Sequence, residues 1–357
     1  MSGSKSVMTP LLLLFLCLLA TVASSGETVG GLELVRRAHY VMGTIFEIEA
    51  YGSDPERTAA AVEEAFAAIR HADAVLSDYR DDSELSLLNR EGAQGFVPLS
   101  SDLFEVLQTS AAYSRLTDSA FDVTVGPLVD LWRRASKQDR WPEDKELSRA
   151  LSVTGWSRLR FDESWQAAQF ERPGMRVDFG GIGKGWAVDL AAEVLRRHGI
   201  ERALISSGTS SIYALGAPPG QTAWKIAIRH PLDADAILAV AALQDESLST
   251  SASYEQDSEI GGRPYSHILD PRTGLPVTTM WSTTVVAPTA TESDALSTAT
   301  FVLGLERSER LLQARGRSAI LAGKGRSNEV VVRRITAPRS RPLWSEGLES
   351  ENGDAHE

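Results

Sequence analysis

The chain has 357 residues, of which 43% are hydrophobic and 24% are charged, values that are ordinary for a globular protein. Its formal net charge of -12 argues against a general nucleic-acid-binding protein, because neutralising phosphates needs an excess of Lys and Arg. An acidic chain that binds a phosphorylated ligand has to use backbone N–H groups, a few placed cations or a metal ion. The length allows one large domain or two smaller ones.

The N-terminus has the pattern of a secretory signal peptide over residues 1–25. Lys5 precedes an apolar run over Leu11–Ala20, and small residues follow, with Ala23 or Ser25 as candidate cleavage positions. The alternative is an uncleaved anchoring helix, although the run is short for a segment that spans a bilayer. We therefore expect an exported protein.

Hydrophobic periodicity predicts a mixture of long helices and hairpin-linked strands. This mixture favours an α+β fold over a doubly wound sheet. Residues 337–357 are rich in Ser, Glu, Arg and Gly without periodicity, and we expect a disordered tail there. The expected elements are a strand over Gly43–Gly52, helices over Pro55–Leu76 and Asp102–Leu116, antiparallel strands within Trp224–Pro231 and Ile237–Leu243, a strand over Ser282–Pro288, a helix around Ser293–Leu303, and strands over Ser318–Gly323 and Asn328–Ile335.

The stretch "VDFGGIGKGWAVD", Val177–Asp189, combines glycines with a helix start. We expect a short strand that ends at Asp178, a glycine-rich turn, and a helix that opens at Lys184 and ends before Gly199. Glycines before a helix N-terminus let backbone N–H groups approach a phosphate. The alternative is a tight strand-to-helix turn with an exposed lysine, because the spacing matches neither a Walker loop nor G-x-G-x-x-G.

The stretch "TESDALSTATFVLG" places Asp294 and Thr298 four residues apart on one helical face. A carboxylate and a hydroxyl at that spacing can offer two oxygens to a hard cation such as Mg2+, which takes few protein ligands together with phosphate and water. The alternative is a capped helix start, since Ser293 and Asp294 also suit the first turn of a helix.

The stretch "YSHILDPRTGLPV" places a histidine ahead of a tight turn. Asp270–Gly274 has an Asx residue, a proline and a glycine where a positive φ is needed. His267 lies three residues before Asp270 and is a candidate acid or base, because histidine titrates near neutral pH. A structural histidine beside a hairpin turn is the alternative.

Together these stretches resemble the ApbE family, the flavin transferases that act as FAD:protein FMN transferases. The resemblance runs from about Val41 to Thr336, within one domain placed at residues 35–336. It implies a T-fold-like α+β architecture. The motifs that carry it are "MGT", "SDYRDDSELSLLN", "FDVTVGPLVDLW", "VDFGGIGKGWAVD", "STSASYE", "HILDPRTGLPV" and "SDALSTATFVLG".

The resemblance implies that FAD binds with Mg2+ and that its pyrophosphate is cleaved. FMN is then transferred to a Thr or Ser hydroxyl of a partner protein, and AMP leaves. Some members of the family instead hydrolyse FAD to FMN and AMP. Asp294 and Thr298 match the metal-binding pair, and Gly181 matches a position whose main chain supplies another oxygen.

The remaining site residues implied by the resemblance contact the flavin nucleotide or take part in the transfer. His267 orients or deprotonates the acceptor hydroxyl or stabilises the attacked phosphate, and Asp270 shares this role or only caps the turn. The residues matching positions at the flavin site or along its pocket are Met42, Tyr79, Asp122, Asp178, Lys184 and Ile268.

Two departures from the family pattern concern small residues. Thr209 and Ser210 occupy a place where the family often has paired glycines, and Ala252 stands where glycine is usual. Because glycine often marks a close backbone approach, these side chains are expected to narrow the pocket, alter nucleotide affinity or shift the balance between transfer and hydrolysis.

The leading hypothesis is an exported, periplasmic Mg2+-dependent transferase that flavinylates redox proteins. It is either freed by cleavage or held at the inner-membrane surface by an uncleaved N-terminus. The alternatives are an FAD pyrophosphatase on the same scaffold and a flavin-binding carrier without turnover.

Overall fold

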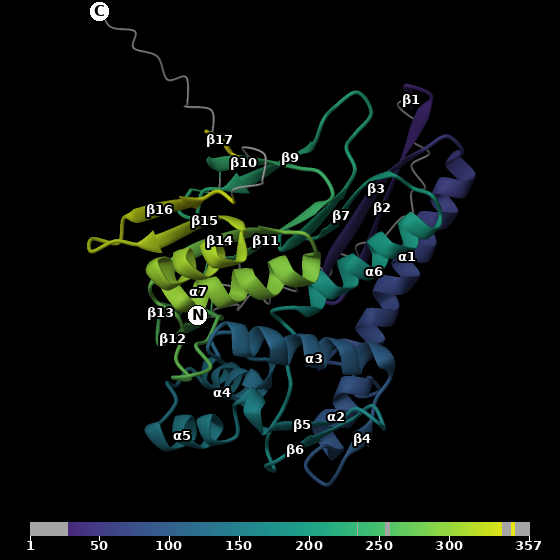
Figure 1. Cartoon of the computed structure of the whole chain (residues 1–357). Helices are drawn as coiled ribbons and strands as arrows, with labels where there is room; N and C mark the ends of the chain where they lie inside the picture. The colour runs from purple at the N-terminus through teal and green to yellow at the C-terminus, as the bar shows by residue number, and fades with distance from the viewer. Residues whose placement is uncertain (1–27, 234, 254–257, 338–343, 347–357) are drawn as a thin grey trace, which may run out of the picture.

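The computed structural model describes residues 28–233, 235–253, 258–337 and 344–346, and the predicted signal peptide lies outside them (Figure 1). Its helices are α1 (Pro55–Leu76), α2 (Glu84–Glu91), α3 (Ser101–Leu116), α4 (Gly126–Lys137), α5 (Asp144–Ser152), α6 (Gly183–Arg197) and α7 (Ala290–Arg315), with short 3-10 turns at Val123–Val125 and Trp156–Arg158.

One large antiparallel sheet forms the frame of the molecule. Its order is β1-β2-β3-β7-β8-β11-β14-β15-β16, and every neighbouring pair is antiparallel. This mixture of helices with antiparallel sheets confirms the α+β prediction. Its strands are β1 (Thr28–Val29), β2 (Leu32–Val41), β3 (Thr44–Gly52), β7 (Arg202–Ser207), β8 (Ser211–Leu215), β11 (Glu246–Ala252), β14 (Met280–Ala287), β15 (Ser318–Lys324) and β16 (Val330–Ile335).

Three smaller sheets complete the described chain. One has the order β17-β10-β9, a second pairs β12 with β13, and a third has the order β4-β6-β5. Their strands are β4 (Val97–Pro98), β5 (Leu159–Asp162), β6 (Ala167–Phe170), β9 (Trp224–Arg229), β10 (Ile237–Leu243), β12 (Ser258–Ile260), β13 (Arg263–Tyr265) and β17 (Trp344–Glu346).

The main sheet is covered on both faces. Helices α1, α6 and α7 pack on one face, as Figure 1 shows. On the other face, Leu248 and Val286 of the main sheet share an apolar cluster with Trp224 and Leu243 of the β9–β10 hairpin. Alternate residues of β11 therefore face either the small sheet or α7.

The helix boundaries follow their capping residues. The Asp54 carboxylate accepts hydrogen bonds from Glu56 N and Arg57 N at the start of α1, and the predicted helix over Pro55–Leu76 is confirmed. Ser100 caps α3 in the same way, and the predicted hairpin of β9 with β10 is also confirmed. The late helix is longer than expected, because α7 continues to Arg315 through a non-helical residue at Gly304.

The expected strand that ends at Asp178 is not formed. Val177 pairs with a side chain instead of a strand: its N–H donates to Asn89 Oδ1 at 2.7 Å, and its carbonyl accepts from Asn89 Nδ2 at 2.9 Å. The Asn89 amide therefore supplies the pair of hydrogen bonds that a neighbouring strand would give. Periodicity along one segment cannot reveal such a distant partner.

The expected tail also differs from the prediction in one place. Within residues 337–357, Trp344–Glu346 forms β17, which pairs with Ala239–Ala241 of β10. Most of the tail, residues 338–343 and 347–357, lies outside the described residues. In the part of the chain that is described, no helix is both long and apolar enough to cross a membrane.

Helices α6 and α7 meet closely beneath the sheet. The Asp189 carboxylate of α6 accepts from Ala290 N and Thr291 N, both at 2.8 Å, and so caps the N-terminus of α7. A Cβ placed on Gly185 would lie 2.2 Å from the Ala290 carbonyl oxygen and 2.8 Å from Asp294 Cβ. Glycine is therefore required at position 185 for the two helices to approach.

We expect Gly185→Ala to separate α6 from α7 and to lower the free energy of unfolding by about 1–3 kcal/mol, as overpacking of a close contact does. Chemical denaturation measures this change. The matched control is Gly95→Ala, where the added methyl group meets nothing within 4 Å. Equal stability of the two variants would contradict the required close approach.

Candidate functional site

A cavity of about 1400 Å³ opens beside the N-terminus of α6. It is bounded by the β2–β3 turn, the segments around Tyr79 and Asp122, the glycine-rich turn, the segment after β13, and α7. All of the predicted site residues except Asp270 line this cavity. They are Met42, Tyr79, Asp122, Asp178, Gly181, Lys184, His267, Ile268, Asp294 and Thr298.

The three predicted metal-binding residues lie together. Asp294 and Thr298 are one turn apart on α7, and a Cβ built on Gly181 would lie 3.0 Å from Thr298 Oγ1. Their carboxylate, hydroxyl and main-chain carbonyl are hard oxygen donors of the kind that Mg2+ takes. The donor set therefore fits a magnesium ion whose other ligands come from phosphate and water.

The donor set contains a single carboxylate. Among the described residues, no group of three or more His, Cys, Asp or Glu side chains is arranged to hold a metal ion. A cation at this place would therefore depend on Asp294 for its only full protein charge. A site in which the protein supplies only one negative charge suits a cation that binds together with a nucleotide diphosphate.

Asp294 is a buried carboxylate, with only 3% of its surface exposed. Its Oδ2 atom accepts from Gly185 N at 2.9 Å, in the first turn of α6. Burial raises the pKa of the Asp294 carboxyl, while Lys184 and the hydrogen bonds from Gly185 and Ser211 lower it. A bound cation would favour the ionised carboxylate further.

Lys184 stands in the first turn of α6 with its side chain at the cavity wall. No ion pair or hydrogen bond to another residue of the described chain engages its ammonium group. An available cation at a helix N-terminus, next to backbone N–H groups, is a favourable setting for a phosphate.

Met42 enters the cavity from a strained turn. Met42 and Gly43 join β2 to β3 with φ values of 51° and 75°, the geometry of a type I′ turn. A positive φ is unusual for a residue with a side chain and is found at functional sites. The Met42 methyl group lies 3.6 Å from the position of a Cβ on Gly183, so the turn lies against the start of α6.

Tyr79 lies at the edge of the cavity, and its ring packs against the side chain of Arg133. The Arg133 guanidinium lies 4.9 Å from the centre of the Tyr79 ring, and its Nη2 donates to the Tyr79 hydroxyl at 2.6 Å. Tyr79 is 78% exposed. A ring supported on one side and exposed on the other can stack on a flat ligand.

Arg133 also links two carboxylates of the cavity wall. It pairs with Asp78 at 3.3 Å and with Asp178 at 3.7 Å. Asp178 Oδ1 in turn accepts from Gly180 N at 2.7 Å, which holds the glycine-rich turn. Burial, followed by the nearby Asp78 charge, raises the pKa of Asp178. Asp178 therefore has turn-holding contacts as well as a place in the cavity wall.

Asp122 lines the cavity, but its carboxylate is already occupied by internal hydrogen bonds. One oxygen accepts from Thr124 N and Thr124 Oγ1, at 2.8 and 2.7 Å, and the other accepts from Trp156 N at 2.8 Å. Only 4% of Asp122 is exposed. Through these contacts, Asp122 shapes the wall of the cavity.

His267 faces the cavity with an unsatisfied nitrogen. Its Nδ1 atom is buried and has no hydrogen-bond partner among the described residues. Burial, with a smaller contribution from the Lys184 charge, lowers the pKa of His267 to about 4. The imidazole is therefore neutral near pH 7 and can accept a proton.

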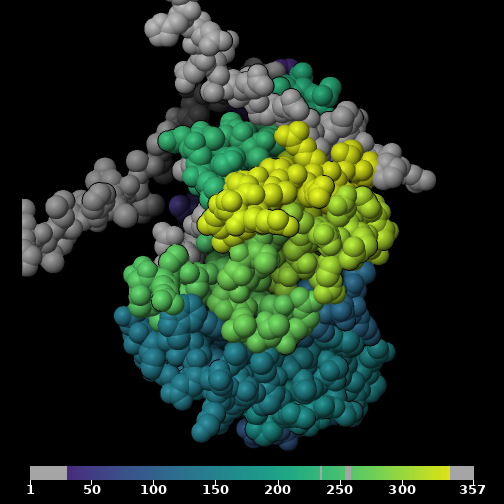
Figure 2. Space-filling view, turned by 90° about the vertical axis from the view of Figure 1, so that its left-hand side faces the viewer, coloured from purple at the N-terminus to yellow at the C-terminus, as the bar shows by residue number. Residues whose placement is uncertain are grey.

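The turn after His267 docks on α4 and α5, as Figure 2 shows for the light green segment above the blue ones. Trp132 Nε1 donates to the Gly274 carbonyl at 2.8 Å. Gly274 has a φ of 73°, and a Cβ there would lie 2.6 Å from Leu147 and 2.9 Å from Leu128. The turn therefore needs glycine for both its conformation and its contact with the helices.

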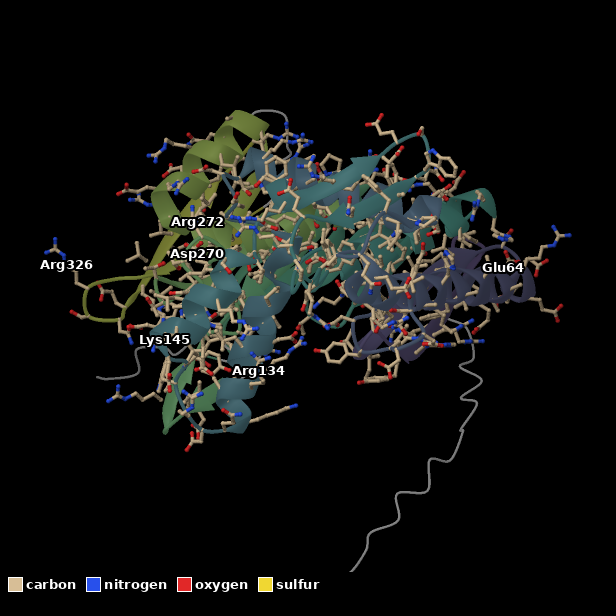
Figure 3. The ribbon with its side chains drawn as sticks, turned by 90° about the horizontal axis from the view of Figure 1, so that it is seen from below. Glu64, Arg134, Lys145, Asp270, Arg272 and Arg326 are labelled. Atoms are coloured by element: carbon tan, nitrogen blue, oxygen red, sulfur yellow. The ribbon has the colours of Figure 1, made fainter. Side chains whose placement is uncertain are left out.

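Asp270 lies within this turn and does not line the cavity. Its carboxylate accepts from Arg272 Nε and Nη2, both at 2.8 Å, and its carbonyl accepts from Gly274 N at 2.7 Å. Figure 3 shows Asp270 beside Arg272. These contacts fit the turn-capping alternative for Asp270.

The positions where the family pattern has glycine also border the cavity. Thr209, Ser210 and Ala252 all line it. Gly208, just before them, has a φ of 57° and turns the chain between β7 and β8. Side chains at these three positions therefore narrow the space that a ligand in the cavity can occupy.

Several residues of the site carried no separate signal in the sequence. Asn89 and Asp189 end the stretches "SDYRDDSELSLLN" and "VDFGGIGKGWAVD", and Arg133 directly follows "FDVTVGPLVDLW". Arginine in an amphipathic helix, asparagine near a helix end and aspartate within a helix are all common on protein surfaces. Their partners lie 55, 88 and 101 positions away in the chain, so only the fold reveals their contacts.

The chain has an α+β fold, and a helix N-terminus, a lysine, a histidine and a set of hard oxygen donors line one cavity. These are features of a nucleotide-binding enzyme. The model of the ApbE family matches residues 42–321. The chain belongs to the ApbE family.

The chain is similar to known flavin transferases over most of its length. It is 32% identical to the FAD:protein FMN transferase of Escherichia coli K12, over 79% of this chain and 82% of that protein. It is 33% identical to that of Treponema pallidum, over 83% and 86%. The structure of the flavin transferase ApbE from Vibrio cholerae matches with a TM-score of 0.75 at 29% identity, covering 85% of this chain and 97% of that one.

We expect His267 to titrate with a midpoint of about 4 in the protein without ligand. Because its ordinary value is 6.5, the unfolded chain binds more protons between pH 6.5 and 4, and the folded state loses stability as the pH falls through this window. Nuclear magnetic resonance titration of the imidazole protons, assigned with His267→Gln, measures the midpoint. A midpoint near 6.5 would show that the ring is not desolvated.

Proposed function

We propose that this protein is an FAD:protein FMN transferase that uses Mg2+. The observation that carries the proposal is the convergence of Asp294, Thr298 and Gly181 with Lys184 and His267 around one cavity. Membership of the ApbE family and the similarity to FAD:protein FMN transferases support it. The acceptor is proposed to be a redox protein with a Thr or Ser hydroxyl.

The proposed roles follow from the chemistry of each side chain. Asp294, Thr298 and the Gly181 carbonyl would hold Mg2+, which would offset negative charge on the diphosphate of FAD. Lys184 and the N-terminus of α6 bind phosphate oxygens. Met42 and Tyr79 pack against flat rings of the substrate, with Ile268 and Asp122 shaping the pocket.

In the proposed reaction, the oxygen of the acceptor hydroxyl attacks the FMN phosphorus of FAD. The bond from this phosphorus to the bridging oxygen breaks, and AMP leaves with that oxygen. A new phosphoester joins FMN to the acceptor. Neutral His267 accepts the proton of the hydroxyl or orients it, a role that suits an imidazole whose pKa is lowered.

Two other outcomes use the same scaffold. An FAD pyrophosphatase would let water replace the acceptor hydroxyl and would release FMN and AMP without a partner protein. A flavin-binding carrier would keep FAD intact. Thr209, Ser210 and Ala252 at the cavity wall are the residues that bear on this choice.

Export is proposed from the N-terminal pattern. The protein would act in the periplasm, either freed by cleavage or held at the inner-membrane surface by an uncleaved N-terminus. Lys5 and the apolar run over Leu11–Ala20 support this location. The acidic balance of the chain leaves nucleic acid outside the proposed partners.

Asp294→Asn is expected to abolish transfer, because it removes the only carboxylate among the proposed metal ligands. Purified protein is incubated with FAD, Mg2+ and a candidate acceptor, and mass spectrometry follows the addition of one FMN. The matched control is Glu306→Gln, which removes an exposed carboxylate from the same helix outside the cavity. FMN and AMP formed without an acceptor would favour the pyrophosphatase, and intact FAD would favour the carrier.

His267→Ala is expected to lower the rate of transfer by about 10²–10⁴-fold, the usual contribution of a general base. FAD affinity, measured by flavin fluorescence, should change far less. The control is His198→Ala, because His198 pairs with Glu64 at a helix end outside the cavity. A His267→Ala enzyme with an unchanged transfer rate would remove the histidine from the proposed reaction.

A further inference from the structure

Strand β9 is the outer strand of its small sheet and borders the cavity. The order of this sheet is β17-β10-β9, so β10 covers β9 on one side only among the described strands. Four consecutive residues of β9, Ile226–Arg229, line the cavity. Because successive side chains of a strand point to opposite faces, four in a row border one cavity only where the edge of the strand is turned toward it. The uncovered edge of β9 therefore opens into the cavity.

The main chain of this edge is available for pairing. His230 N donates to the carbonyl of the residue just before β10 at 2.9 Å. In an antiparallel ladder the main-chain groups of alternate residues point to the same side, so those of Ile226 and Ile228 face β10. Those of Ala227 and Arg229 then face the cavity, and no hydrogen bond from another element of the described chain engages them. An open row of N–H and C=O groups can pair with an incoming strand.

The cavity is larger than a nucleotide alone needs. Pockets for small molecules and cofactors are commonly about 300–1,000 Å³ in volume. This cavity has a volume of about 1400 Å³, and it extends from the proposed metal donors of α7 to the edge of β9. An FAD:protein FMN transferase has to hold FAD and a segment of its acceptor protein at the same time. The end of the cavity at β9 provides room for that segment.

Strand β11 connects β9 to the proposed metal site. Ile228 of β9 shares an apolar cluster with Leu248 of β11. Three residues further along β11, Ser251 Oγ lies 3.4 Å from Thr298 Oγ1. Three residues of a strand span about 10 Å. A segment that pairs with β9 therefore needs about three further extended residues to bring a hydroxyl to the proposed metal site.

Arg229 gives the edge of β9 a positive charge. It is exposed, lines the cavity, and makes no ion pair with another residue of the described chain. The chain as a whole has a net charge of -12, so this cation differs in sign from the general balance of the protein. An acidic side chain on a docked segment would complement it and favour encounter. The edge therefore fits an extended segment that carries a carboxylate.

We propose that the free edge of β9 docks an extended segment of the acceptor protein as an added strand. The docked segment carries its Thr or Ser hydroxyl along β11 to the proposed metal site, and Arg229 pairs with an acidic side chain of the same segment. This inference rests on the proposed function.

The first test removes an N–H group that faces the cavity. Proline is tolerated at the free edge of a sheet, because the ladder does not use the missing N–H. Ala227→Pro therefore removes a pairing group while β9 stays paired with β10. The matched control is Lys225→Pro, which makes the same change on the same edge at a residue that does not line the cavity. Thermal unfolding confirms that each variant is folded.

We expect Ala227→Pro to raise the KM for the acceptor protein in FMN transfer by at least about 10-fold, because the docked strand loses a hydrogen bond and meets the proline ring. The affinity for FAD, measured by flavin fluorescence, should be unchanged. Lys225→Pro should leave both quantities unchanged.

A second variant leaves the main chain intact and decides the question even where a proline variant fails to fold. Arg229→Gln should raise the KM for the acceptor by a few-fold at low salt, as loss of an exposed ion pair does. The matched control, Lys225→Gln, should leave this KM unchanged. The effect of Arg229→Gln should disappear at high salt, because salt screens an exposed pair.

Hydrogen exchange detects the added strand directly. The complex is held before transfer by combining His267→Ala protein with FAD, Mg2+ and the acceptor. Amide exchange at Ala227 and Arg229, measured by nuclear magnetic resonance, should slow when the acceptor is added. Exchange at Ile226 and Ile228 should change little, since β10 already protects these amides.

Two results would overturn the docking surface while leaving the proposed function in place. One is an unchanged acceptor KM in folded Ala227→Pro and Arg229→Gln, with unchanged exchange at Ala227. The other is a loss of FAD affinity in Ala227→Pro, which would assign this end of the cavity to the nucleotide. If the unmodified protein transfers FMN to no acceptor, the proposed function is refuted, and the docking role is refuted with it.

Discussion

The contact between the first turn of α6 and the buried carboxylate of Asp294 holds the candidate site together. A carboxylate with 3% exposure costs several kcal/mol to desolvate unless polar groups compensate it. Here the Gly185 N–H donates to the carboxylate, and the nearby Lys184 charge favours its ionised form, both from the first turn of α6. The groups that stabilise Asp294 therefore also set the distance between the phosphate-binding turn and α7.

The rest of the fold supports this junction. Asp189 caps α7 from α6, and Gly185 allows the two helices to approach, so the register of Asp294 against the glycine-rich turn is fixed from two sides. The main sheet supplies β8 and β11 behind the carboxylate. On the opposite side of the cavity, Trp132 fixes the turn that follows His267. Binding and reacting groups thus come from separate segments, each held by its own contacts.

Much of the fold followed from local patterns. The helix over Pro55–Leu76 has an apolar stripe and a capping aspartate, and both signals are contained within the segment itself. The strand predicted to end at Asp178 was wrong, because Val177 is hydrogen-bonded to the side chain of Asn89 and a strand pattern cannot reveal such a partner. Strand β17 was missed for the same reason, since its pairing with β10 depends on a distant part of the chain.

The candidate site was predictable where a residue type matched its chemistry at a short spacing. Asp294 and Thr298 share a helical face, and His267 precedes a rigid turn, so both features were visible from the residues themselves. The metal role of Gly181 and the pocket residues came from the resemblance to the ApbE family. The role of Arg133 was not predictable, because it comes from contacts between α4 and two distant segments, at Asp78 and at Asp178.

The central claim is that Asp294, Thr298 and the Gly181 carbonyl bind one divalent cation against the diphosphate of FAD. A crystal structure of the protein with FAD and Mn2+, with the metal located by its anomalous scattering, tests this claim most directly. We expect one strong peak in direct contact with Asp294, Thr298 and a phosphate oxygen. A peak elsewhere in the cavity, or FAD bound with no metal between these residues and its phosphates, would contradict it.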